Sequence, residues 1–218
     1  MHEINENNSL ELLNKEPESE VKNYEIESLE EPMKAMLSQM LPRIENGDYD
    51  LIIGIDASGR VPALIMDKIV NYIYEKKGRE HHNMRFLAGR VTEEDAEYEI
   101  KKWNPVKRVL LVEDTILYGS SIRGITRSLI KLNIKFDIAA ISNIENLDKI
   151  DAGEIFFGMT NSPSIYSKHQ LGGVRKYSGD RFSAPLRTSI EQGKVTEARK
   201  DIDIVVQRLI NWYEGRNE

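Results

Sequence analysis

The chain has 218 residues, of which 40% are hydrophobic and 30% are charged, and it contains no cysteine. This length and composition are typical of one globular domain, and the absence of cysteine excludes disulfides and thiolate chemistry. No apolar run approaches the roughly 20 residues of a membrane-spanning helix, and the first residues lack the pattern of a secretory signal. We therefore expect a cytoplasmic protein without a membrane partner.

The net charge of −6 is concentrated near the N-terminus. Residues 1–31 contain ten glutamates and two lysines, a charge of −8 that leaves +2 for the rest of the chain. A polar, acidic segment with few aromatic residues is typical of a disordered or solvated leader. We expect such a leader at residues 1–23 and a single domain at residues 24–218. The sequence shows no basic stripe suited to nucleic acid.

The first regular pattern along the chain is a helix whose apolar residues recur at helical spacing and stop before Asn46-Gly47. We expect this methionine-rich stripe in the core; its members are Met33, Met36, Leu37, Met40, Leu41 and Ile44. Apolar runs and helical patterns then alternate. They predict strands at about 51–55, 84–88, 109–112, 136–141 and 154–158, helices at about 61–76, 92–102 and 122–132, and a final helix at about 195–213. This alternation is typical of an α/β fold with a mainly parallel five-stranded sheet and helices on both faces.

Residues 106–122, VKRVLLVEDTILYGSSI, join a buried strand to polar side chains that can bind a ligand. The apolar run 109–112 is typical of a parallel strand covered on both faces, and Glu113 and Asp114 follow it. Ligands of open α/β sheets bind beyond the carboxyl ends of strands, where two carboxylates can accept hydrogen bonds from vicinal hydroxyls or lie near a cation. The Gly-Ser-Ser sequence at 119–121 precedes a helical pattern and suits an anion. Together these features predict a site for a phosphorylated sugar.

This segment resembles the phosphoribosyl-pyrophosphate (PRPP) signature of type I phosphoribosyltransferases: four apolar residues, two acids, a short variable stretch, and a Gly and Thr/Ser cluster. The resemblance implies that Glu113 and Asp114 hold the ribose hydroxyls, act in catalysis and contribute to Mg²⁺ binding, partly through ligand and water. It also implies a loop for the ribose 5′-phosphate formed by Thr115, Leu117, Tyr118, Gly119, Ser120 and Ser121. The family commonly has Thr-Gly-Gly-Thr where this chain has Tyr118-Gly119-Ser120-Ser121.

Residues 50–65, DLIIGIDASGRVPALI, form a second apolar strand that ends in a Gly/Ser turn before a helix. They are similar to the pyrophosphate loop of the same family, most of all to that of the adenine-type enzymes. The resemblance implies a pyrophosphate site at Asp56, Ala57, Ser58, Gly59 and Arg60. Those enzymes commonly have arginine immediately before the last glycine, whereas this chain has Ser58 there and Arg60 after the glycine.

The implied activity is transfer of the 5-phosphoribosyl group from PRPP to a nitrogenous base, with release of pyrophosphate and with Mg²⁺ as cofactor, as in purine salvage. The family carries a variable hood over the acceptor. Its expected position here is residues 161–187, where Tyr177 and Phe182 are candidates to stack on the base. The family also closes a mobile lid over the reaction, and residues 89–105 occupy that position but look helical. Members are often homodimers, which the methionine-rich helix would permit.

Other interpretations stay open at this stage. A phosphoribosyltransferase-like protein that binds PRPP or a nucleotide in a regulatory role fits the altered loops and lid, and a nucleotide phosphorylase or hydrolase is a weaker third possibility. A strand ending in Glu113 and Asp114 also opens many receiver domains, but these need a phosphoacceptor aspartate at a later strand end, and Asp137 falls within the predicted strand 136–141. Each of the two loops, taken alone, is also typical of an ordinary turn between a strand and a helix. The two loops together favour the phosphoribosyltransferase interpretation.

Overall fold

The computed structural model describes residues 24–56, 59–103, 105–116, 119–143, 153–160 and 189–216. Its centre is a five-stranded parallel sheet with the strand order β2-β1-β3-β4-β5. The strands are β1 (Leu51–Asp56), β2 (Asn83–Ala88), β3 (Arg108–Ile116), β4 (Lys135–Asn143) and β5 (Ile155–Thr160). The predicted α/β fold class is therefore confirmed. The predicted leader and hood, with Tyr177 and Phe182, lie outside the described residues.

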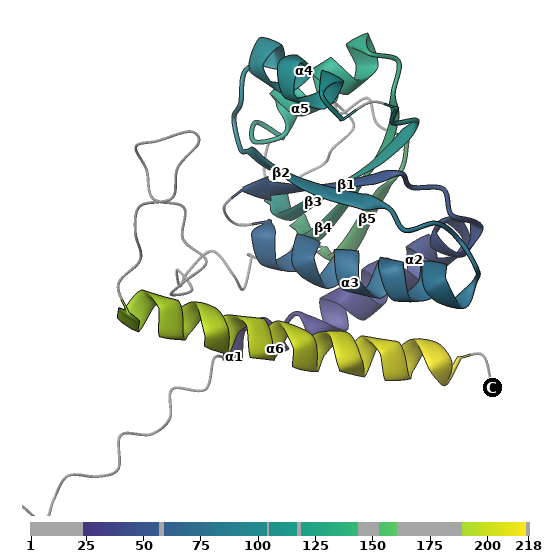
Figure 1. The fold of residues 1–218 in the computed structure, drawn as a ribbon, viewed down its shortest axis with the longest axis vertical. Coiled ribbons are helices and arrows are strands. Elements are labelled where there is room, and N and C mark those ends of the chain that lie inside the picture. The colour runs from purple at the N-terminus through teal and green to yellow at the C-terminus, as the bar shows by residue number, and fades with distance from the viewer. Residues whose placement is uncertain are drawn as a thin grey trace, which may run out of the picture.

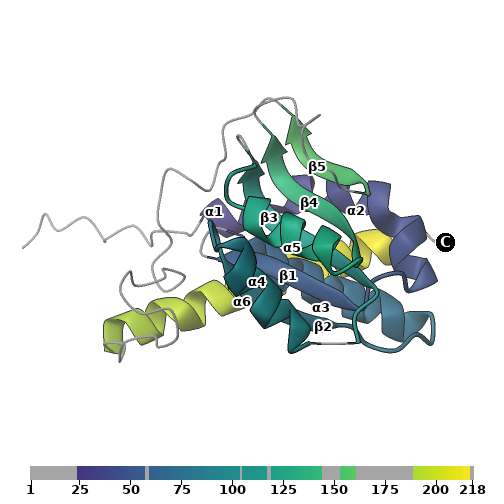
Figure 2. The same cartoon turned by 90° about the horizontal axis from the view of Figure 1, so that it is seen from above.

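Helices cover both faces of this sheet (Figures 1 and 2). On one face lie α4 (Glu93–Lys101) and α5 (Arg123–Lys131), and on the other lie α2 (Glu30–Asn46) and α3 (Arg60–Lys76). The long helix α6 (Ser189–Glu214) runs along the outer side of α3, close to the short helix α1 (Tyr24–Glu27), which the sequence did not predict. None of the described helices has both the length and the apolar composition needed to cross a bilayer.

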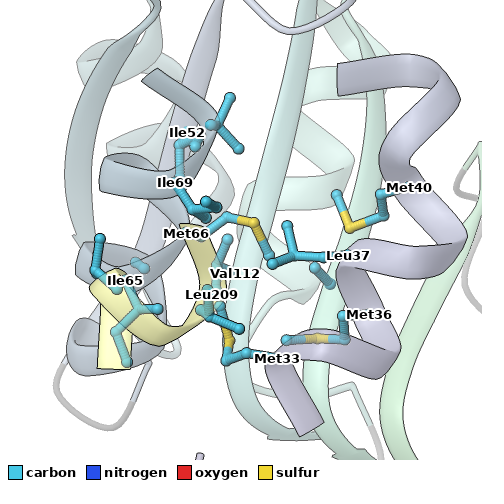
Figure 3. Close-up of a cluster of buried hydrophobic side chains, with 14 of the residues drawn as sticks. Met33, Met36, Leu37, Met40, Ile52, Ile65, Met66, Ile69, Val112 and Leu209 are labelled. Atoms are coloured by element: carbon cyan, nitrogen blue, oxygen red, sulfur yellow. The ribbon is translucent and has the colours of Figure 1, made fainter. Parts of the chain in front are cut away.

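The larger hydrophobic core lies between α2, α3, α6 and the sheet, and Figure 3 shows part of it. Met33, Met36 and Met40 of α2 are fully buried there, together with Met66 of α3 and Leu209 of α6. The core position predicted for the methionine stripe is confirmed. Because these methionines are buried within one chain, they are not available as a surface for the homodimer that the resemblance suggested.

β3 pairs with its two neighbours over different lengths, so β1 and β3 separate before β3 ends. Pairing between β1 and β3 ends at Gly54 and Val112, whereas β3 stays paired with β4 as far as Ile116. The sequence predicted that the strand would end at Val112, and this was wrong: Glu113, Asp114 and Thr115 continue β3. The strand continues beyond the apolar run because these residues stay paired with β4.

Candidate functional site

The carboxyl ends of β1 and β3 form the point where the direction of winding changes. The helix that follows β1, α3, covers one face of the sheet, and the helix that follows β3, α5, covers the other (Figure 2). Ligands of doubly wound sheets bind in the crevice at such a switch point. Both predicted loops, after Asp56 and after Ile116, start at this edge, so the structure brings together the two segments that the sequence singled out.

The turn after β1 packs directly against β3 at Gly59. The Gly59 N–H donates to the Ile55 carbonyl at 2.9 Å. A Cβ atom at Gly59 would lie 2.7 Å from the carbonyl oxygens of Ile55 and Val112 and 3.1 Å from the Cα of Glu113. Only glycine allows so close an approach, so Gly59 fixes the start of α3 beside the acidic pair. Ala57 and Ser58, also predicted for this site, lie outside the described residues.

Glu113 and Asp114 are buried carboxylic acids, 2% and 5% exposed. The Asp114 N–H donates to Glu113 Oε1 at 3.1 Å. Burial and the neighbouring Asp114 carboxyl raise the pKa of Glu113 well above its usual 4.5, although the Asp114 N–H and the Ser121 hydroxyl oppose this shift. Two buried negative charges at this place are therefore unfavourable, and hydroxyl donors or a cation would offset that cost.

The predicted phosphate loop is described in part. Gly119 is buried and adopts a φ of +65°, a left-handed conformation that favours glycine, while Ser120 is exposed and Ser121 is half-buried. Thr115 belongs to β3 and not to the loop, and its hydroxyl is buried without a hydrogen-bond partner among the described residues. Leu117 and Tyr118 lie outside the described residues. The structure thus leaves a buried hydroxyl and a serine pair at the edge where the acidic pair lies.

Two helices begin at this edge without a side-chain cap. The N-cap residues of α3 and α5 are Gly59 and Ile122, and the first turn of neither helix contains an acid. In contrast, α4 is capped by the Thr92 hydroxyl, which accepts from the Asp95 N–H at 3.1 Å, and has three acids in its first turn. Uncapped N–H groups and the positive end of the helix dipole bind anions. The starts of α3 and α5 are therefore suited to phosphate, and that of α4 is not.

Arg60, predicted to contact pyrophosphate, is held by Asp56. Its Nε and Nη2 donate to the two carboxylate oxygens at 3.0 and 2.6 Å, and its guanidinium lies 5.0 Å from the centre of the Phe86 ring. This bidentate pair keeps a cationic group beside the start of α3. To contact pyrophosphate, the Arg60 guanidinium must either share its hydrogen bonds between Asp56 and the ligand or break those to Asp56. Binding of pyrophosphate by Arg60 therefore stays a prediction.

The sequence analysis assigned the turn after β2 only to the lid segment, residues 89–105, and did not predict its contacts with the other two loops. The Gly89 N–H donates to the Asp56 carbonyl and the Arg90 N–H donates to the Ser121 carbonyl, both at 2.9 Å. The turn thus links the segments that follow β1 and β3. Arg90 has a φ of +62°, a conformation that is strained for a residue with a side chain. The sequence signal that could have identified this turn is Gly89, a glycine directly after the predicted strand 84–88.

The segment that the resemblance assigned to a mobile lid, residues 89–105, packs against α5. The predicted helix is confirmed as α4, and the Ser128 hydroxyl of α5 donates to the Glu93 carbonyl at 2.7 Å. Lys131 pairs with Glu97 at 2.6 Å. A Cβ atom at Gly124 would lie 2.0 Å from the Val91 carbonyl oxygen, so the backbone of α5 touches the chain just before α4. These contacts join α4 to α5, the helix that follows the predicted phosphate loop.

Comparisons with known proteins add little to this geometry. No family model matches the chain, and no curated protein matches it. Among solved structures, a purine phosphoribosyltransferase from Pyrococcus horikoshii Ot3 is similar, with a TM-score of 0.35 and 14% sequence identity. The match covers 56% of this chain and 80% of that chain. So low a similarity assigns no function, and the functional interpretation depends on the residues of the site.

Proposed function

We propose that this protein binds PRPP at the carboxyl ends of β1 and β3 and transfers its 5-phosphoribosyl group to a nitrogenous base, with release of pyrophosphate. The observation that carries the proposal is the buried pair Glu113 and Asp114, which lies where β1 and β3 separate. Two uncapped helix starts flank this pair. A ribose with phosphates at its two ends matches this order of groups: anion site, paired carboxylates, anion site.

The acidic pair supports recognition of ribose. Vicinal hydroxyls can donate hydrogen bonds to the Glu113 and Asp114 carboxyls, and these bonds replace the solvation that burial removes. The phosphate ends follow from the helices. The start of α5 suits the 5′-phosphate, since the serines at 120–121 precede it, and the start of α3 suits the pyrophosphate, since Arg60 lies in its first turn.

Mg²⁺ fits this site only together with a ligand. Within the described ranges, no cluster of three or more His, Cys, Asp or Glu side chains is placed to hold a metal. Glu113 and Asp114 offer oxygen ligands, and their unfavourable buried charge favours a nearby cation. When bound with PRPP, Mg²⁺ would neutralise part of the charge of the departing pyrophosphate.

The chemistry requires positioning and charge stabilisation more than proton transfer. The base nitrogen forms a bond to C1 of the ribose while the bond from C1 to the pyrophosphate oxygen breaks. The ribose becomes positively charged as pyrophosphate leaves, and the carboxyls of Glu113 and Asp114 stabilise this charge at close range. The N–H groups at the start of α3 stabilise the leaving group, and Gly59 holds that helix start against β3.

The proposal is tested by thermal unfolding with and without PRPP and Mg²⁺. Binding to the folded state alone adds about 2.7 kcal/mol at a hundredfold excess of ligand over its dissociation constant. We expect this stabilisation in the wild type and its loss in the double variant Glu113→Gln/Asp114→Asn. Asp201→Asn/Asp203→Asn on α6 is the control with the same charge change, and it should bind normally. Pyrophosphate release is then measured with each common purine and pyrimidine base, and failure of the wild type to bind PRPP would refute the proposal.

A second candidate function is PRPP or nucleotide binding without catalysis, in a regulatory role. The packing of α4 against α5 favours it, because a fixed helix stands where related enzymes close a lid that excludes water. The same assay separates the two functions. PRPP binding without pyrophosphate release from any base supports the regulatory role, and release with one base supports the enzyme.

A further inference from the structure

A buried histidine lies against α3 at one edge of the sheet. His82 directly precedes the edge strand β2, and its side chain is fully buried. Its Nε2 lies 3.0 Å from Asp67 Oδ1 of α3, and its ring packs edge to face with the Tyr74 ring at 5.6 Å between centroids. In the described part of the chain, Asp67 has no lysine or arginine partner, and the neighbouring Lys68 pairs with Asp203 instead.

The contact between His82 and Asp67 is close, but it is not a hydrogen bond. Neither ring nitrogen of His82 has a hydrogen-bond partner among the described residues, although Nε2 is only 3.0 Å from the carboxylate oxygen. The N–H direction of the ring therefore does not point at this oxygen. The Tyr74 hydroxyl is not a partner either, because it accepts from the Tyr49 N–H at 3.0 Å and donates to the Tyr49 carbonyl at 3.1 Å. Buried polar atoms normally have partners, so this geometry is unusual.

A direct ion pair does not account for this geometry. Protonated His82 would carry two buried N–H groups, and neither has an acceptor within the described ranges. A charge-assisted hydrogen bond would also align an N–H with the Asp67 carboxylate, and no such alignment is present. A nitrogen and an oxygen that lie close together without pointing at each other are instead arranged like two ligands of one cation.

The separation of the two atoms suits a shared metal ion. Nitrogen and oxygen ligands of Zn²⁺ lie roughly 2.0–2.2 Å from the ion. Two such ligands, at an angle between about 90° and the tetrahedral value, are therefore roughly 2.8–3.5 Å apart. The observed distance of 3.0 Å falls within this range, so His82 Nε2 and Asp67 Oδ1 can bind one ion with little movement.

A third ligand is available from the next turn of α3. Asn71 follows Asp67 by four residues, so the two side chains lie on one side of the helix. Asn71 Nδ2 donates to Asp67 Oδ1 at 3.3 Å, and Asn71 Oδ1 is buried without a partner among the described residues. Rotation of the amide by half a turn exchanges its nitrogen and oxygen, which puts an oxygen ligand beside Asp67. The Asp67 side chain is 22% exposed, so water can supply a further ligand from that side.

We propose that His82, Asp67 and Asn71 bind a divalent transition-metal ion such as Zn²⁺. His82 binds through Nε2 and keeps its proton on Nδ1, while Asp67 and Asn71 supply oxygen ligands. An imidazole together with oxygen ligands suits Zn²⁺, whereas Mg²⁺ prefers oxygen alone. The ion links α3 to the start of β2 and has a structural role.

This metal site is separate from the candidate PRPP site. Asn83, which follows His82, pairs with Leu51 at the start of β1. From Leu51 to Asp56 at its carboxyl end, β1 advances roughly 17 Å. Metal binding by His82 therefore does not depend on the proposed transferase function.

The test titrates Zn²⁺ alone into the full-length protein by isothermal calorimetry. We expect one site in the wild type. His82→Ala should weaken binding about a hundredfold or more, because even the indirect partners of a metal ligand contribute roughly 10–100-fold. His81→Ala is the matched control, since it removes the exposed neighbouring histidine and should bind as the wild type does. Circular dichroism checks that all variants are folded.

Two further variants locate the ion and keep the test valid if His82→Ala does not fold. Asp67→Ala lies on a helix, where alanine is favourable, and it should weaken Zn²⁺ binding about tenfold or more. Glu113→Gln/Asp114→Asn should bind Zn²⁺ with unchanged affinity. The proposal is overturned if the wild type binds no Zn²⁺, or if folded His82→Ala or Asp67→Ala protein binds as the wild type does. Loss of binding in His81→Ala or in the Glu113/Asp114 variant also overturns it.

Discussion

Gly59 lies in direct contact with the backbone of Glu113, a residue far from it in sequence. A Cβ atom at Gly59 would lie 3.1 Å from the Glu113 Cα, closer than side chains normally pack. The start of α3 and the acidic pair of β3 are therefore held at one fixed separation. This contact joins the two halves of the candidate site.

Gly59→Ala is expected to lower the free energy of unfolding by about 1–3 kcal/mol, because the added methyl group must push α3 away from β3. Since the start of α3 forms one of the two proposed anion sites, ligand binding should weaken as well. Chemical denaturation measures the first effect and thermal shift with PRPP the second. Gly89→Ala is the matched control, because a Cβ atom there meets nothing closer than 3.4 Å. If both variants lose the same stability, the close approach at Gly59 has no special importance.

Glu113→Gln is expected to stabilise the protein at neutral pH while it abolishes binding. The raised pKa of Glu113 means that the folded state holds this proton more tightly than the unfolded state does. The resulting stability is fully present below the usual pKa of 4.5 and is lost as pH rises through the pKa of the folded state. Gln cannot ionise, so the variant avoids the loss.

Urea unfolding at several pH values measures this effect. The stability gain of Glu113→Gln should grow as pH rises from about 4 towards neutrality. Glu31→Gln, at a side chain that is 80% exposed, provides the control and should show little change. A destabilised Glu113→Gln protein at neutral pH would contradict the assigned direction of the pKa shift.

Gly124→Ala is expected to destabilise the contact between α4 and α5. Alanine in place of glycine normally favours a helix by about 1 kcal/mol, but here the Cβ atom would lie 2.0 Å from the Val91 carbonyl oxygen. We expect a net loss of about 1–3 kcal/mol and faster hydrogen exchange in residues 93–101. Ser128→Ala, which removes the hydrogen bond to the Glu93 carbonyl, should cost about 1 kcal/mol. Unchanged exchange in both variants would show that α4 is held by other contacts.

Asp137→Ala is expected to cost about 3 kcal/mol or more. This buried carboxylate accepts from Arg43 at 2.9 Å, from the Tyr49 hydroxyl at 3.0 Å and from the Glu154 N–H at 2.8 Å. It ties α2, the start of β1 and the start of β5 to β4, and its removal leaves buried donors unpaired. Thermal unfolding measures the loss. Glu154→Gln is the control, since Glu154 also binds Arg43 but is exposed, and its effect should be within about 1 kcal/mol. Equal losses in the two variants would argue against the burial effect.

Sequence patterns were sufficient to predict the fold class, and they also supplied the candidate residues of the site. Helical spacing located α2, α3 and α6, and apolar runs located the strands of the sheet, because both signals arise from burial of one face or both faces of a local element. The position of Glu113 and Asp114 after an apolar run also indicated a site at a strand end. The end of β3 was predicted four residues too early, because strand pairing and not hydropathy keeps residues 113–116 extended.

The spatial relationships within the site could not be read from the chain. The approach of Gly59 to Glu113, the link from Arg90 to Ser121, and the packing of α4 on α5 all join residues that are far apart in sequence. Local patterns fix which elements form, since each depends on residues a few positions apart. Which elements meet depends on strand order and register, and these result from packing of the whole chain.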